Sequence, residues 1–209
     1  MFFGSSITSI IATLLAVLLA ITFHETAHGF VAYKLGDPTA KNQGRLTLNP
    51  LAHLDPVGAL MMFIAGFGWA KPVPVNPFFF NGDRTKGMML VSVAGPVTNL
   101  LLSFIAYFIY AAGGGFVTVP FLNVFLTQMI VLNIYLAIFN LIPVPPLDGS
   151  KILAGFLPRA AAYKYLTTVE QYGFIILLVL IVFNITDMIL VPIANFVLNL
   201  FSMILFAIF

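Results

Sequence analysis

The residues of this chain that could do chemistry are concentrated in one short motif, His24-Glu25-Thr26-Ala27-His28. On an α-helix, side chains four residues apart lie on the same face, so the two imidazoles can bind a single metal ion. The glutamate between them can then reach a metal-bound water molecule and accept its proton. The motif therefore predicts a zinc site with Glu25 as the general base of a hydrolytic reaction.

The motif lies in an apolar segment, where its polar side chains are costly. Two of the three histidines of the chain and one of its two glutamates fall within it. Placing one ionisable side chain at the centre of a membrane helix costs roughly 2.5 to 3.5 kcal/mol on insertion scales. Chemistry inside a membrane is therefore the first hypothesis.

A third metal ligand is expected from Asp148, which follows the proline-rich stretch 140–147. The prolines prevent a helix from continuing, so this backbone must line a cavity or the membrane interface. Two histidines and one carboxylate, with an open fourth position, are typical of catalytic zinc. The alternative is that Asp148 caps a helix beginning near Ser150. We predict one Zn²⁺ per chain, bound by His24, His28 and Asp148.

Composition identifies the setting of this site. With 61% hydrophobic residues, 8% charged residues and a mean hydropathy of +1.06, the chain is an integral membrane protein. Hydropathy predicts five spans, at about residues 7–33, 88–112, 121–142, 166–185 and 188–208. We therefore expect an all-α polytopic membrane protein. Residues 1–209 form one membrane-embedded domain, with a catalytic core at about 7–155 and C-terminal helices at about 166–208.

Several other classes are excluded by composition. The chain has no cysteine, which leaves any metal to His, Asp or Glu side chains. The net charge of +2 is scattered between the spans and gives no case for nucleic-acid binding. The N-terminal apolar run is far longer than a signal-peptide core, so it is expected to be a retained first span.

The long connection 34–87 contains many turn signals and is not expected to span the membrane. Two of its stretches, 45–48 and 72–75, have extended or β character, and prolines would keep the second at a sheet edge. The apolar stretch 58–69 is too short to cross a bilayer and is interpreted as re-entrant or interfacial.

Charge predicts the orientation. All nine basic residues fall in the first and third connections: Lys34, Lys41, Arg45, Lys71, Arg84, Lys86, Lys151, Arg159 and Lys164. Both connections should therefore face the cytoplasm. The histidine pair would lie roughly 8 to 14 Å below the cytoplasmic end of the first span. We expect a multi-pass protein of the cell membrane with its active site toward the cytoplasmic side.

Two of these motifs together resemble a known family. The motif 24–28 and the stretch 140–149, which ends in Leu-Asp-Gly, are similar to the site-2 protease family of intramembrane zinc metalloproteases in a compact form. The stretches 48–56 and 95–99 also resemble segments of this family, and the resemblance covers roughly residues 20–155.

The resemblance implies the roles of the main site residues. Zinc would be bound by His24, His28 and Asp148, with Glu25 as the catalytic base. The substrate would be a transmembrane helix of another membrane protein. The chain has no room for a PDZ or CBS domain, so regulation through such modules is not expected.

Three further polar residues are candidates for supporting roles. Asn140 is expected to help position substrate, as the resemblance implies, with an interhelical hydrogen bond as the alternative. Asn99 follows a Gly-Pro kink, where it would bind substrate or repair freed backbone hydrogen bonds. His53 is interpreted as a gating or structural residue, because a fourth protein ligand would close the zinc site to water. The segment 72–75 would be either a substrate-capturing edge strand or a plain loop.

These residues are compatible with three functions. The leading hypothesis is an intramembrane zinc endopeptidase that acts on a transmembrane protein substrate in the lipid bilayer. The sequence does not decide whether the protein forms a homo-oligomer. A membrane metal-ion transporter is the first alternative, although transporters carry ionisable groups across both leaflets and often have internal repeats. A non-catalytic zinc-binding membrane scaffold is the second, but neither metal binding nor packing would require Glu25.

Overall fold

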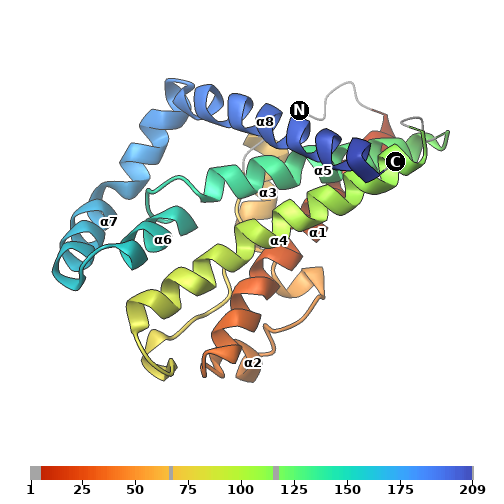
Figure 1. The fold of residues 1–209 in the computed structure, drawn as a ribbon. Helices are drawn as coiled ribbons and strands as arrows, with labels where there is room; N and C mark the ends of the chain where they lie inside the picture. Colours follow the sequence, from red (N-terminus) through yellow and green to blue (C-terminus); the bar gives the residue numbers. More distant parts are fainter. Residues whose placement is uncertain (1–5, 66–67, 115–117, 209) are drawn as a thin grey trace.

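The computed structural model describes residues 6–65, 68–114 and 118–208. This part of the chain is helical, and five of its helices are long and apolar enough to cross a membrane. They are α1 (Ile7–Lys34), α4 (Arg84–Ala112), α5 (Pro120–Asn140), α7 (Arg159–Val182) and α8 (Ile185–Ile208). The predicted all-α polytopic membrane fold with five spans is confirmed (Figure 1).

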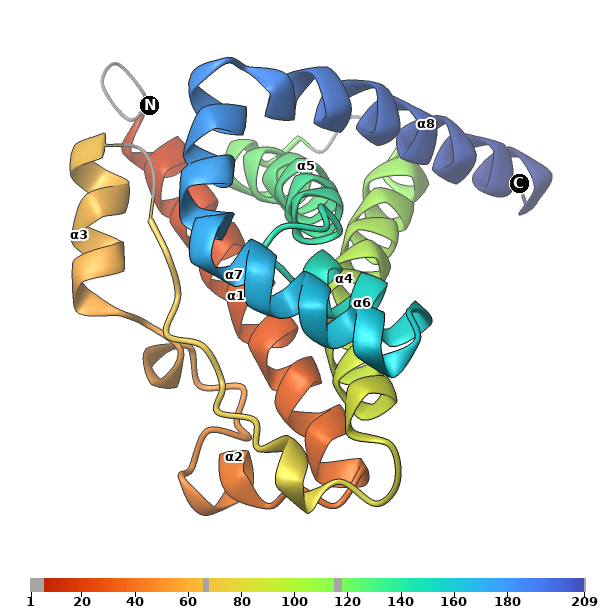
Figure 2. The same cartoon turned by 90° about the vertical axis from the view of Figure 1, so that its left-hand side faces the viewer.

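The centre of the bundle is formed by α1, α4 and α5, with α5 seen almost end-on between the other two in Figure 2. On α1, Ala12, Ala16 and Ala20 are buried at four-residue intervals and so form one face. Ala16 belongs to a core cluster with Ala106 of α4 and Ile134 of α5. Small residues allow membrane helices to approach closely, which brings the histidine-bearing part of α1 near its neighbours.

The connection between α1 and α4 consists of short helices and irregular backbone. It contains α2 (Thr39–Asn42), a 3₁₀ turn at Pro50–Ala52, α3 (Pro56–Ala65) and a second 3₁₀ turn at Pro77–Phe79. Figure 2 shows α3 at the edge of the molecule, beyond α1.

The expectation of β character in this connection holds only in part. Within the described residues, 45–48 and 72–75 form no strand, and the pairing is a single antiparallel bridge between Leu54 and Ala70. Three prolines in the stretch 72–77 cannot donate to a ladder, which explains why no sheet extends from this bridge. The apolar stretch expected at 58–69 is helical as far as Ala65, and residues 66–67 lie outside the described part.

The third connection places Asp148. After α5 ends at Asn140, irregular backbone leads to α6 (Asp148–Phe156), which begins two residues before the predicted start near Ser150. Leu147 occupies the N-cap position, so Asp148 is the first helical residue. The position of its carboxylate therefore depends on how the preceding proline-containing stretch leads into α6. Beyond α6, α7 and α8 complete the chain, and α8 lies along the outer side of the bundle in both views (Figures 1 and 2).

We predict that Ala16→Leu destabilises the protein, because three added carbons would have to fit between α1, α4 and α5. Overpacking of this kind costs about 1 to 3 kcal/mol of unfolding free energy. Thermal unfolding in detergent should show a lower Tm than wild type. Ala161→Leu makes the same change on the exposed surface of α7 and should leave Tm unaltered. Equal Tm values for the two variants would contradict this packing.

Candidate metal centre

Two ligands of the candidate centre come from α1. His24 and His28 are buried on the face of α1 that meets α4, one helical turn apart. Gly95 of α4 makes this possible, since a Cβ there would lie 2.5 Å from Cε1 of His24 and 2.6 Å from Nε2 of His28. The backbone of α4 therefore passes directly against both imidazoles, where only glycine leaves room.

The third ligand comes from the start of α6. Asp148 is buried, and the residue after it, Gly149, packs against the backbone carbonyls of Leu141 and Ile142, 2.3 and 2.4 Å from where a Cβ would lie. Any side chain at Gly149 would push α6 away from the end of α5. The proline-rich turn and this glycine together hold the Asp148 carboxylate over α1.

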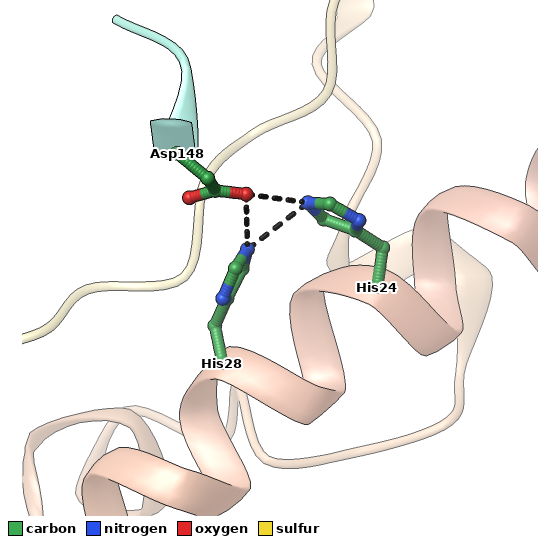
Figure 3. Close-up of side chains that lie close together, drawn as sticks. All are labelled: His24, His28 and Asp148. Atoms are coloured by element: carbon green, nitrogen blue, oxygen red, sulfur yellow. Dashed lines mark hydrogen bonds and ion pairs between the residues drawn. The ribbon is translucent and has the colours of Figure 1, made fainter. Parts of the chain in front are cut away.

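The three side chains converge on one point, as Figure 3 shows. Nε2 of His24 lies 3.0 Å from Nε2 of His28, and Oδ2 of Asp148 lies 3.3 and 3.2 Å from these two nitrogens. Zinc–ligand bonds of about 2.0 to 2.1 Å in tetrahedral geometry place neighbouring ligand atoms about 3.4 Å apart. The triangle thus has the dimensions of three zinc ligands.

The hydrogen bonds on the far sides of the rings determine which nitrogens carry protons. Nδ1 of His28 lies 2.7 Å from the carbonyl oxygen of Val91, which can only accept. Nδ1 of His24 lies 2.5 Å from Oδ1 of Asn99, also an acceptor. In the neutral rings both Nδ1 atoms are therefore protonated, and both Nε2 atoms direct a lone pair toward the centre of the triangle.

The Asp148 carboxylate completes a set of acceptors. Its Oδ2 is buried and accepts no hydrogen bond. Three acceptor atoms at contact distance repel one another unless a cation lies between them. Two imidazole nitrogens and one carboxylate oxygen are atoms that commonly coordinate Zn²⁺, so these three side chains fit a zinc ion.

The site has an open side. A cavity of about 400 Å³ adjoins the three ligands and is also lined by Glu25, Asn140 and Lys151. It is also lined by Pro72, Val73 and Val75 of the segment 72–75, and the backbone N–H of Val73 donates to Oε2 of Glu25 at 2.7 Å. Glu25 is therefore held beside the candidate ligands by one oxygen, and the cavity leaves the triangle open on this side.

The segment 72–75 is anchored at both ends. The Arg45 guanidinium donates to the carbonyl oxygen of Lys71 at 2.7 Å, and the N–H of Asn76 donates to Oδ2 of Asp37 at 2.6 Å. Asp37 is completely buried and also accepts from Thr39. These bonds to charged groups fix the segment against α1.

The remaining predicted residues lie in different places. Asn140 lines the cavity, with its amide N–H₂ donating to the carbonyl of Leu136 at 2.9 Å. Asn99 lies behind His24, buried between helices. His53 lies outside the ligand triangle, and its Nε2 is 2.8 Å from the Thr47 carbonyl. That carbonyl also accepts from Thr26 of α1, so His53 lies close to a residue inside the motif 24–28.

Sequence reasoning missed three residues at this site. Lys151 lines the cavity one turn after Asp148, and Gly95 packs on the imidazoles. Asn133 hydrogen-bonds to Asn99 at 2.7 Å. The signal for Asn133 was its position in a nearly uncharged span, seven residues before Asn140 and so on nearly the same face of α5.

Known proteins provide an independent comparison. The profile of Peptidase family M50 matches residues 114–183. "Putative zinc metalloprotease YwhC" of Bacillus subtilis is 46% identical over 200 residues, which cover 91% of this chain and 90% of YwhC. "Putative zinc metalloprotease Rip2" of Mycobacterium tuberculosis (strain H37Rv) is 31% identical, covering 78% of this chain and 63% of Rip2.

A more distant relative is "Putative zinc metalloprotease MJ0611" of Methanocaldococcus jannaschii, 28% identical over 71% of this chain and 72% of its own length. No solved structure matches the chain. The match to YwhC extends over nearly the whole of both chains. The chain belongs to peptidase family M50, the site-2 protease family of zinc metalloproteases.

Proposed function

We propose that this protein is an intramembrane zinc endopeptidase that cleaves a transmembrane segment of another membrane protein. The observation that carries the proposal is the triangle of His24, His28 and Asp148, which is open to a cavity lined by Glu25. Its two histidines lie on a helix long and apolar enough to cross a membrane. A metal that only stabilised the fold would have four protein ligands and no open side. Membership of the M50 family supports the same conclusion.

The proposed reaction is hydrolysis of a peptide bond. When bound, zinc supplies Lewis acidity and lowers the pKa of a coordinated water toward about 7. Glu25 would accept a proton from the water that attacks the substrate carbonyl, and would pass it to the amine that leaves when the peptide C–N bond breaks. One carboxylate oxygen of Glu25 is held by the Val73 N–H, which leaves the other to take the proton.

The substrate must be extended at the bond that is cut. A helical carbonyl is engaged in its own hydrogen bond, so a membrane helix has to unwind before it reaches the site. The segment 72–75 borders the cavity and offers main-chain groups with which an unwound stretch can pair. The Asn140 amide on the same cavity can satisfy a further exposed backbone group.

A second groove gives the substrate room beyond the cleavage site. It has a volume of about 690 Å³, lies between α4, α6 and α7, and shares Met88, Pro146 and Lys151 with the metal cavity. Residues that flank the scissile bond can lie there. The basic residues of the first and third connections support a cytoplasmic position for both openings.

We predict that Glu25→Gln binds zinc as wild type does but loses cleavage by about 10² to 10⁴-fold, because the amide cannot accept the proton. Purified protein in liposomes would be incubated with a panel of transmembrane peptides, with and without a chelator, and the products identified by mass spectrometry. Asp187→Asn, which neutralises an exposed acid at the start of α8, is the matched control and should cleave normally. Equal cleavage by Glu25→Gln and wild type would rule out this mechanism.

Asp148→Ala is expected to weaken zinc itself. Removing a ligand should lower affinity by more than the roughly 10- to 100-fold that loss of an outer hydrogen-bond partner costs. Competition with a fluorescent zinc chelator would give Kd for wild type, Asp148→Ala and the exposed control Asp187→Ala. The proposal predicts a large loss in the first variant alone. Unchanged affinity in Asp148→Ala would remove Asp148 from the site.

A further inference from the structure

Two asparagines lie completely buried in the centre of the bundle. Asn99 of α4 and Asn133 of α5 each have 0% of their surface exposed. An amide inside a membrane bundle must have its hydrogen bonds satisfied by other protein groups. Both side chains meet this demand through a single connected chain of bonds that ends at the zinc ligand His24.

The direction of this chain is fixed at its far end. The Asn133 N–H₂ donates to the carbonyl of Met129 at 2.8 Å, in its own helix, so Oδ1 of Asn133 must face away. That oxygen accepts from the Asn99 N–H₂ at 2.7 Å. The same N–H₂ also donates to the carbonyl of Ala20 at 3.2 Å. Oδ1 of Asn99 is thereby turned toward Nδ1 of His24, at 2.5 Å.

The orientation of Asn99 decides whether His24 can bind metal. With Oδ1 toward the ring, Nδ1 carries the proton and Nε2 has a free lone pair for zinc. If the amide rotated by 180°, its N–H₂ would face Nδ1, and the neutral ring would carry its proton on Nε2. A protonated Nε2 is not a ligand. The bond that the Asn99 N–H₂ donates to Oδ1 of Asn133 opposes this rotation, and it is shorter than the bond to the Ala20 carbonyl.

We propose that Asn133 is a positioning residue for zinc, which acts through Asn99 to hold His24 in its metal-binding tautomer. The inference rests on zinc binding by the proposed function but not on any substrate. An alternative role is structural, since the amide pair also joins α4 to α5. Ser103 separates the two roles: it is equally buried on α4, and its hydroxyl donates to the carbonyl of Ile130 on α5 at 2.9 Å without touching His24.

The test measures metal affinity and not cleavage. Asn133→Leu keeps a similar volume but removes the acceptor for Asn99, and we expect zinc affinity to fall by roughly 10- to 100-fold. Ser103→Ala removes the matched interhelical bond and should keep wild-type affinity. Zn²⁺ affinity would be measured by chelator competition, and absorption of the Co²⁺-loaded protein would report the ligand set.

A second substitution should rescue the first. In Asn99→Asp/Asn133→Leu, an aspartate oxygen faces Nδ1 of His24 in either orientation, so the position of Asn133 no longer matters. The double variant should regain affinity to within about threefold of wild type, against the roughly 10- to 100-fold loss in Asn133→Leu. Where Asn133→Leu fails to fold in detergent, Asn133→Ala gives the same comparison, because alanine also lacks an acceptor for Asn99.

The outcomes of these measurements separate a failure of the Asn133 proposal from a failure of the proposed function. Unchanged affinity in the Asn133 variant would overturn the proposal, as would an equal loss in Ser103→Ala or a failure of Asn99→Asp to restore binding. Absence of zinc binding by the wild-type protein would instead refute the proposed function. The two failures are thus distinguishable.

Discussion

Three acceptor atoms held within 3.0 to 3.3 Å of one another, in a buried position, are the constraint on which the rest of this structure depends. Without a cation their lone pairs would repel, and burial would make that repulsion stronger. The surrounding sequence keeps them in place. Gly95 lets α4 pass against the imidazoles, and Gly149 lets α6 approach α5. The site is therefore a property of helix packing as much as of its ligands.

The apolar surroundings of the bundle explain why its buried polar side chains are hydrogen-bonded to one another or to the backbone. In the described part of the bundle, the buried amides Asn99 and Asn133 and the imidazoles of His24 and His28 all have hydrogen-bond partners, as buried groups in an apolar medium require. The segment 72–75, which borders the cavity, is also held by hydrogen bonds to protein groups. Charged side chains of Arg45 and Asp37 anchor both ends of the segment 72–75, so irregular backbone at this site is satisfied by protein and not by lipid.

Prediction from sequence succeeded where a pattern was long or local. The five spans were recognised because each is about 20 or more apolar residues, a length that soluble helices of this composition rarely reach. The first connection was predicted less well. Extended character at 45–48 and 72–75 gave no strand among the described residues, because β pairing depends on a partner that local propensity does not identify. Within the part of the connection that the structure describes, strand pairing is limited to the bridge between Leu54 and Ala70.

The sequence by itself determined which atoms could bind a metal and that two of them share a face, because the 3.6-residue period of a helix follows from the chain alone. It also placed Asp148 after a stretch that cannot be helical. Only the tertiary structure decided that the Asp148 carboxylate turns toward the imidazoles, that Val73 holds Glu25, and that Asn99, 75 residues from His24, fixes its tautomer. These contacts join segments far apart in the chain, and their geometry arises only when the helices pack.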